Sequence, residues 1–236
     1  MHINKTYSNI KVIGFDADDT LWVNEPFYRE TEADFCKLLS KYHPEDYVNE
    51  QLLKTELNNL ELYGYGAKGF VLSLIETALR ITNYELEPSI ITKTIELGKQ
   101  LLNKPVELLD DVEETLACLS SKNYTLIIAT KGDLLDQERK LRKSKLGKYF
   151  HHIEVMSDKT PKNYLTLLNH LEVKPSEFVM VGNSLRSDIL PPLEIGAQAI
   201  HIPFHTTWVH ESVSENEIES KSIVSLNSIK ELCGLF

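Results

Sequence analysis

The stretch that decides the fold is Ile10-Lys11-Val12-Ile13-Gly14-Phe15-Asp16-Ala17-Asp18-Asp19-Thr20. It begins with a short apolar run, which is typical of a strand buried on both faces of a parallel sheet. It ends with three acidic side chains and a hydroxyl group. Because ligands of open α/β sheets bind at the carboxyl ends of the strands, these polar side chains are candidates for a functional site.

Further apolar runs resemble the first and are separated by helical patterns. The predicted strands are Tyr124–Ala129, His152–Met156, Phe178–Val181 and Ala199–Ile202, with a last signal at Ser222–Leu226. The predicted helices are Asp133–Leu146, Pro161–Leu171, residues 185–195 and Asn227–Cys233. Alternating strands and helices imply right-handed crossovers in a layered domain. The predicted fold class is therefore α/β, with a Rossmann-like, doubly wound parallel sheet.

Residues 23–105 follow a different pattern. Apolar residues recur there at the helical period in four groups, which predicts four amphipathic helices. The groups are Phe35/Leu38/Leu39/Tyr42, Leu53/Leu57/Leu60, Val71/Leu74/Ile75/Ala78 and Ile91/Ile95/Gly98/Leu102. We therefore expect an all-helical cap domain at 23–105, inserted into an α/β core domain formed by 1–22 and 106–236. A polar surface loop is expected at Glu211–Lys221.

The composition bounds the possible partners. The 236 residues are 42% hydrophobic and 25% charged, which excludes a disordered chain. The net charge of −10 disfavours binding to nucleic acid or to an anionic membrane. We see no apolar run long enough to span a membrane and no signal-peptide core near Met1. Three isolated cysteines argue against a disulfide framework, so we expect a cytoplasmic protein.

Chemically useful side chains follow the later strands as well. They are Thr130, Lys131, Lys159, Lys162, Asn183 and Asp188. Carboxylates placed together raise one another's pKa unless a cation neutralises them. Asp16, Asp18 and Asp188, with the Asn183 amide, offer only oxygen atoms, and such hard ligands suit Mg²⁺. The sequence therefore predicts a magnesium site of the kind that phosphoryl chemistry uses.

The order of these motifs resembles the haloacid dehalogenase superfamily of hydrolases. The family pattern has Asp-x-Asp-x-Thr after a strand, Thr or Ser after the second strand, a later Lys, and Gly-Asp-x-x-x-x-Asp or a near variant. The matching positions are Phe15–Thr20, Thr130, Lys159 or Lys162, and Gly182-Asn183 through Asp188. The helical insert also lies where the family carries a cap, so the resemblance covers essentially the whole chain.

The resemblance implies a role for the first motifs. Asp16 is the expected nucleophile, which forms an aspartyl-phosphate that water then hydrolyses. Asp18 is the expected general acid and base, and its main-chain carbonyl is expected to bind the metal. Thr130 and the main-chain amide of Lys131 are expected to hold the phosphoryl oxygens.

The later motifs supply charge and metal ligands. Lys159, in preference to Lys162, is expected to offset charge on Asp16 and on the phosphoryl group. Asp188 is expected to bind Mg²⁺ directly. Asn183 stands where the family commonly has Asp, so it is expected to reach the metal through its amide oxygen or through a water.

The activity implied is Mg²⁺-dependent hydrolysis of a small phosphorylated metabolite by a monomer or homodimer. Asp18 favours this reaction, because a 2-haloacid dehalogenase needs neither a metal nor a second acid at that position. A phosphomutase, a 2-haloacid dehalogenase and a non-catalytic receiver-like module phosphorylated on Asp16 stay open as alternatives. All three would use the same acidic sheet edge.

Residues around the motifs carry further expectations. We expect the cap to close over the site, with Tyr65 or Lys68 of the glycine-rich loop, and Lys131, contacting the substrate. Asp19 is expected to be a turn or capping residue. Trp22 is expected to pack where the chain leaves the core for the insert.

Overall fold

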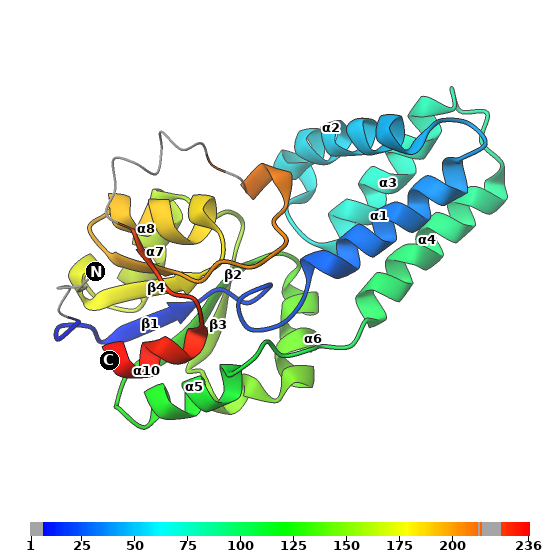
Figure 1. The fold of residues 1–236 in the computed structure, drawn as a ribbon. Coiled ribbons are helices and arrows are strands. Elements are labelled where there is room, and N and C mark those ends of the chain that lie inside the picture. Colours follow the sequence, from blue (N-terminus) through cyan, green and yellow to red (C-terminus); the bar gives the residue numbers. More distant parts are fainter. Residues whose placement is uncertain (1–6, 212, 214–222) are drawn as a thin grey trace. The chain divides into compact units, whose positions relative to one another are not determined.

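Six strands form one sheet in the computed structural model, which describes residues 7–211, 213 and 223–236 (Figure 1). The strand order is β3-β2-β1-β4-β5-β6. β1 pairs in parallel with β2 and β4, β4 with β5, and β5 with β6. The Rossmann-like, doubly wound prediction is confirmed. The strands are β1 (Val12–Phe15), β2 (Thr125–Lys131), β3 (His152–Met156), β4 (Phe178–Gly182), β5 (Gln198–His201) and β6 (Val224–Ser225).

The chain divides into two compact units, which are described separately. The sheet unit comprises the described residues up to Glu25, together with 106–130 and 138–236. The helical unit comprises Pro26–Pro105 and Lys131–Gln137. Most of the predicted loop at Glu211–Lys221, and the first residue of the predicted strand at Ser222–Leu226, lie outside the described residues. Within the described chain, no helix combines the length and apolar character that a membrane crossing requires.

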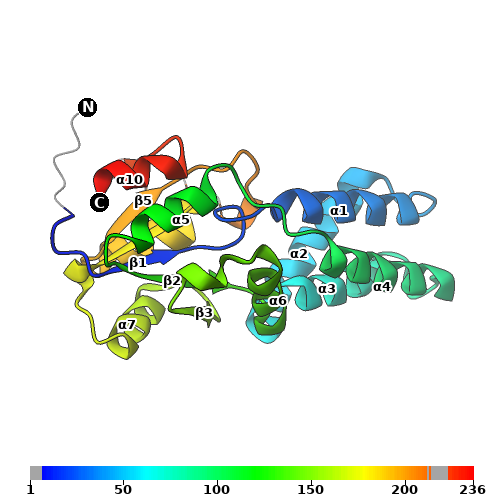
Figure 2. The same ribbon diagram turned by 90° about the horizontal axis from the view of Figure 1, so that it is seen from below.

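Helices cover both faces of the sheet (Figures 1 and 2). α5 (Val112–Ser120) and α10 (Leu232–Leu235) pack on one face, and α7 (Pro161–His170) packs on the other and contacts α8 (Leu190–Glu194). The remaining helical segments are α6 (Leu134–Ser144), η1 (Leu146–Tyr149), η2 (Pro175–Glu177), η3 (Leu185–Ile189), η4 (Val209–Glu211) and η5 (Ile229–Glu231).

Three predicted helices are interrupted or displaced. Residues 185–195 form the π-helical turn η3 followed by the short α8, because Pro191 and Pro192 have no N–H to bond back into the preceding turn. The helix predicted at Asp133–Leu146 ends at Ser144, since Lys145 takes a left-handed φ of 60°. The helix predicted at Asn227–Cys233 is instead the 3₁₀ turn η5 followed by α10.

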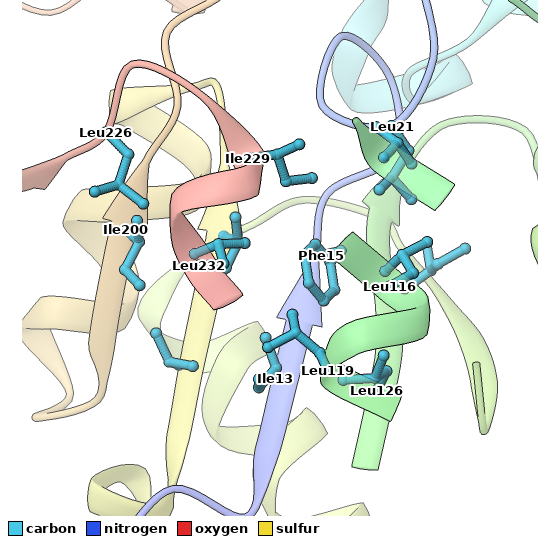
Figure 3. Packing of buried hydrophobic residues seen from close by; sticks show 14 of the residues in the cluster. Ile13, Phe15, Leu21, Leu116, Leu119, Leu126, Ile200, Leu226, Ile229 and Leu232 are labelled. Atoms are coloured by element: carbon cyan, nitrogen blue, oxygen red, sulfur yellow. The ribbon is translucent and has the colours of Figure 1, made fainter. Parts of the chain in front are cut away.

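The sheet core follows from the two-residue period of its strands. Alternate residues of β1, β2 and β4 point to opposite faces, and both sets are buried along β1, β4 and the middle of β2, so β1 and β4 are apolar throughout. One set packs with α5, η5 and α10 (Figure 3), and the other packs with α7. The first set includes Ile13, Phe15, Leu126, Ile128, Val179 and Val181, and the second includes Val12, Ile127, Ala129, Phe178 and Met180.

The helical unit contains the four predicted helices and a core of its own. They are α1 (Glu25–Leu39), α2 (Glu45–Tyr63), α3 (Ala67–Ile81) and α4 (Pro88–Asn103). The core is formed by Phe35, Cys36, Leu39, Val48, Leu52, Ala67, Phe70, Leu74, Ala78, Ile81, Ile90 and Leu101.

The buried faces of α2 and α4 differ from the predicted ones. In α2 the prediction that Leu53, Leu57 and Leu60 form the buried face is wrong, since Leu57 is 40% exposed while Leu52 is buried. In α4 the predicted Ile95 is 40% exposed, while Thr94 is buried. Polar side chains occupy these inward faces because they bond locally: Thr94 Oγ1 donates to the Ile90 carbonyl, for example. A search for apolar periodicity alone cannot find such a face.

Candidate active site

A buried lysine joins the ends of two strands at the carboxyl edge of the sheet. Lys159 Nζ donates to Asp16 Oδ1 at 2.5 Å and to Asp188 Oδ1 at 2.6 Å. Asp16 directly follows β1, Asp188 lies in η3 just after β4, and Lys159 lies between β3 and α7. The exposed fractions of Asp16, Lys159 and Asp188 are 7%, 3% and 1%. The parallel sheet therefore brings together three charges from three distant parts of the chain.

Local backbone geometry fixes Asp188. The Ser184 N–H donates to Asp188 Oδ2 at 3.0 Å, while Ser184 Oγ accepts from the Ser187 N–H and caps η3. A Cβ added at Gly182 would lie 2.3 Å from Asp188 Oδ2, so only glycine allows this approach. The π-helical turn is a rare conformation that often marks functional positions. Strand end and turn together aim the carboxylate at Lys159.

The charge state of this trio follows from its burial. Burial raises the pKa of Asp16 to about 7, against the lowering effect of Lys159, and the carboxylate of Asp188 raises it further. Burial opposes the charge of Lys159, but the carboxylates of Asp16 and Asp188 outweigh it and raise the pKa of the lysine above its usual value. Lys159 therefore stays charged at neutral pH, and one ammonium is shared by two carboxylates. Additional positive charge at this point would favour the ionised form of Asp16.

Oxygen atoms that could bind a divalent cation lie near Asp16. Thr20 Oγ1 lies 3.2 Å from both Asp16 Oδ2 and Asn183 Oδ1, which places the Asn183 amide oxygen beside the nucleophile candidate. Within the described residues, no three His, Cys, Asp or Glu side chains gather closely enough to hold a metal ion by themselves. Asp16 and Asp188 offer two carboxylates, and Asn183 offers a neutral oxygen. This donor chemistry fits Mg²⁺, which accepts waters for its remaining positions.

The carboxylate of Asp18 is held separately from the trio. Its Oδ1 accepts from Trp22 Nε1 at 2.7 Å and from Lys140 Nζ at 2.9 Å. Lys140 Nζ also donates to Asn24 Oδ1 at 2.7 Å. The predicted cluster of three aspartate side chains is therefore two carboxylates around Lys159 and a third with its own donors. Trp22 is fully buried, as expected for a packing residue, but its indole N–H also bonds to the acid/base candidate.

Asp19 serves the turn that follows. It has a φ of 60°, and its carboxylate accepts from the N–H groups of Asn24 (2.8 Å) and Glu25 (2.9 Å), at the start of α1. Burial raises the pKa of Asp19 to about 8, against the lowering effect of these two donors. The prediction that Asp19 is a turn and capping residue is confirmed.

The remaining motif residues, Thr130 and Lys162, lie near the ends of other elements of the fold. Thr130 lies near the end of β2 and is 1% exposed. Lys159 contacts Asp16 and Asp188, whereas Lys162 is exposed in the first turn of α7. The sequence favoured Lys159 over Lys162, and in the structure Lys159 is the lysine that contacts the two carboxylates.

Three residues expected to contact the substrate lie in the helical unit. Lys131 Nζ lies 3.9 Å from the centre of the Tyr65 ring, and Lys68 Nζ lies 2.9 Å from Asp133 Oδ2. Gly66 fits against this segment with a φ of 115°, where a Cβ would lie 2.7 Å from the Asp133 nitrogen. Segment 131–137 thus belongs with the glycine-rich loop, a grouping that nothing in the sequence indicated.

Two residues that contact the candidate site belong to no motif in the sequence, Lys140 and Glu211. Lys140 lies within a run of basic residues on α6, so nothing in its spacing marks it as the one that turns toward Asp18. Glu211 Oε2 accepts from Ser187 Oγ at 2.5 Å and also from the Oγ of Ser184, the residue whose N–H donates to Asp188. Glu211 is 23 residues beyond Asp188 in the sequence, and no motif contains it.

Comparisons with known proteins identify the family of this chain. A family model described as haloacid dehalogenase-like hydrolase matches residues 10–196. The chain therefore belongs to the haloacid dehalogenase-like hydrolases, and it is an enzyme of the hydrolase class. A solved haloacid dehalogenase-like family hydrolase from Xanthomonas campestris is 42% identical with a TM-score of 0.79, covering 85% of this chain and 84% of its own.

Two relatives are phosphatases. Glyceraldehyde 3-phosphate phosphatase of Methanopyrus kandleri is 24% identical over 199 residues, which are 82% of this chain and 84% of that protein. N-acylneuraminate-9-phosphatase of Homo sapiens is 26% identical over 216 residues, which are 87% of this chain and 84% of that protein. This chain is similar to both along most of its length.

Proposed function

We propose that this enzyme is a Mg²⁺-dependent phosphatase that hydrolyses a small phosphorylated metabolite through an aspartyl-phosphate on Asp16. The observation that carries the proposal is the buried Asp16–Lys159–Asp188 trio, with Asp18 held two residues from the nucleophile. The relatives named for glyceraldehyde 3-phosphate and N-acylneuraminate 9-phosphate support a small ester as substrate.

In the first step, a carboxylate oxygen of Asp16 attacks the phosphorus atom. A bond forms between Asp16 and phosphorus, and the ester bond between phosphorus and the substrate oxygen breaks. The departing alkoxide takes a proton from the Asp18 carboxyl group. The products of this step are the free alcohol, the aspartyl-phosphate and an ionised Asp18.

In the second step, the ionised Asp18 takes a proton from a water molecule. The resulting hydroxide attacks phosphorus, and the bond between phosphorus and Asp16 breaks. Inorganic phosphate leaves, and Asp16 and Asp18 return to their starting protonation states. Asp18 thus acts as acid and then as base, so atoms and protons balance over one turnover.

Lys159 and Thr130 stabilise the phosphoryl group in this scheme. Lys159 remains charged while Asp16 changes from a carboxylate to an acyl phosphate, so its ammonium becomes available to the phosphoryl oxygens. The Thr130 hydroxyl and the main-chain amide of Lys131 are proposed to donate to these oxygens as well. Buried donors act strongly because water does not screen them.

The residues that would hold Mg²⁺ are Asp16, Asp188, Asn183 and the main-chain carbonyl of Asp18. Bound Mg²⁺ would supply positive charge that lets an anionic nucleophile approach an anionic ester. The buried, incompletely neutralised carboxylates support this assignment, because they gain most from a further cation. Tyr65, Lys68 and Lys131 are proposed to contact the substrate from the helical unit.

The test is turnover of phosphate esters by the wild type and by Asp16→Asn. We expect hydrolysis that needs Mg²⁺ and is lost in EDTA, and a loss on the order of 10⁴-fold or more in Asp16→Asn, as for other removed nucleophiles. Isomerisation of the ester in the presence of a bisphosphate would identify a phosphomutase instead. Release of halide from a 2-haloacid in EDTA, without ester hydrolysis, would identify a dehalogenase.

A further inference from the structure

We propose that Lys140 and Trp22 are positioning residues for Asp18, which fix one carboxylate oxygen so that the other one transfers the proton. This inference rests on the proposed function. It goes beyond it by assigning a role in acid/base catalysis to a lysine outside the four motifs.

Both hydrogen bonds reach the same oxygen. Trp22 Nε1 and Lys140 Nζ lie 2.7 Å and 2.9 Å from Asp18 Oδ1. A neutral carboxyl group carries its proton on one oxygen and accepts hydrogen bonds with the other. Because Asp18 Oδ1 accepts from both donors, the protonated form of Asp18 carries its proton on Oδ2.

Trp22 and Lys140, which together form a clamp on Asp18 Oδ1, are each held in place by other contacts. Trp22 is fully buried, so its indole cannot follow a moving carboxylate. The Lys140 side chain is 17% exposed, and its ammonium also donates to Asn24 Oδ1 at 2.7 Å. Asn24 is itself held by the hydrogen bond that its main-chain N–H donates to Asp19 Oδ1. All of these residues lie in the sheet unit.

A surface ion pair would explain the contact less well. Exposed pairs hold their side chains loosely and stabilise proteins little. Here the Asp18 side chain is 24% exposed, and its other donor is an indole in the core, which adds a fixed direction to the charge. Proton transfer is sensitive to such positioning, because donor and acceptor must come within hydrogen-bond distance.

The test compares Lys140→Met with Lys143→Met, an exposed lysine on the same helix. The substrates are p-nitrophenyl phosphate, whose leaving group needs no proton, and an alkyl phosphate, whose leaving group does. We expect Lys140→Met to lower kcat/KM about 100-fold for the alkyl phosphate and by less than about 3-fold for p-nitrophenyl phosphate. Lys143→Met should match the wild type on both substrates.

The double variant Asp18→Asn/Lys140→Met isolates the mechanism. Once Asp18 cannot donate, Lys140→Met should cause no further loss on the alkyl phosphate. Equal losses on the two substrates, or an added loss in the Asp18→Asn background, would overturn the inference. If Asp18→Asn alone shows the leaving-group dependence and Lys140→Met does not, the proposed function stands and only this inference fails.

A second measurement does not depend on activity. The protein has two tryptophans, Trp22 and Trp208, so its indole N–H groups are easily assigned by NMR. Asp18→Asn and Lys140→Met should both shift the Trp22 indole signal, and Lys143→Met should not. An unshifted Trp22 signal in Lys140→Met would show that no clamp exists in solution.

Discussion

Replacing Lys159 by methionine removes the positive charge that lies between two buried carboxylates. Methionine keeps much of the aliphatic side chain but removes the ammonium that Asp16 and Asp188 share. Both carboxylates are then left buried, at 7% and 1% exposure. Removing one partner of a buried ion pair typically costs about 3–5 kcal/mol. We expect Lys159→Met to lose about that much unfolding free energy in EDTA at about pH 8, a large share of the stability of an ordinary domain.

Urea unfolding followed by tryptophan fluorescence is the assay. Trp22 and Trp208 both lie in the sheet unit, so their emission follows the unit that holds the site. With a slope of about 2–3 kcal/mol per molar urea, the midpoint should fall by about 1–2 M. Lys162→Met is the matched control, because Lys162 is exposed and three residues away, and its stability should stay within about 0.5 kcal/mol of the wild type.

Two further conditions sharpen this prediction. Added Mg²⁺ should stabilise Lys159→Met more than the wild type, because the variant has two unshared carboxylates. Lowering the pH toward about 5 should also reduce the deficit, because Asp16, whose pKa is raised by burial, takes up a proton and loses its charge. Equal stabilities of Lys159→Met and the wild type in EDTA would refute the reasoning that this lysine balances the buried charges.

Three further predictions concern the cap of α1, the face of α2 and a buried thiol. Asp19→Ala should cost about 1–2 kcal/mol of unfolding free energy, because it removes the acceptor for two N–H groups, and Asp19→Asn should cost less, as measured by urea unfolding. Leu52→Ala should destabilise the helical unit by about 2–5 kcal/mol, whereas Leu57→Ala should cost less than about 1 kcal/mol; equal losses, measured by circular dichroism, would contradict the observed face. Burial, with nearby Glu45 and Glu32, raises the pKa of the Cys36 thiol to about 11, so at about pH 8 iodoacetamide should modify Cys36 in urea but not in the native protein. The same shift predicts that stability falls as the pH rises from 9.0 toward about 11, since only the unfolded thiol ionises readily in that range.

The centre of the sheet could be predicted because β1 and β4 are apolar along their whole length. β1 and β4 are buried on both faces, so a continuous apolar run such as Phe178–Val181 admits few other interpretations. The positions of Asp16 and Asp188 follow from this, since both come soon after strands that are neighbours in the sheet. Strand ends and acidic residues are thus visible in sequence before any coordinates are known.

Other features depend on contacts that no local pattern records. Lys140 and Lys143 lie in the same basic run, and no sequence pattern distinguishes them. Only the packing of α6 turns Lys140 toward Asp18. The buried face of α2 contains Thr55 and Asn59, whose side chains bond to the Gln51 carbonyl and to Ser73 and Glu76, so apolar spacing misplaces it. Because polar side chains can be buried when they form hydrogen bonds, the positions of the leucines alone do not identify the buried face of a helix.

The central claim is that phosphorus is transferred to Asp16, and chemical trapping of the intermediate tests it most directly. The wild type is mixed with an excess of substrate and Mg²⁺, quenched during turnover and reduced with borohydride, which converts an aspartyl-phosphate into homoserine. Peptide mass spectrometry should find homoserine at position 16 and nowhere else, and the signal should be absent without substrate. Steady release of phosphate with unmodified Asp16 at every quench time would contradict the account.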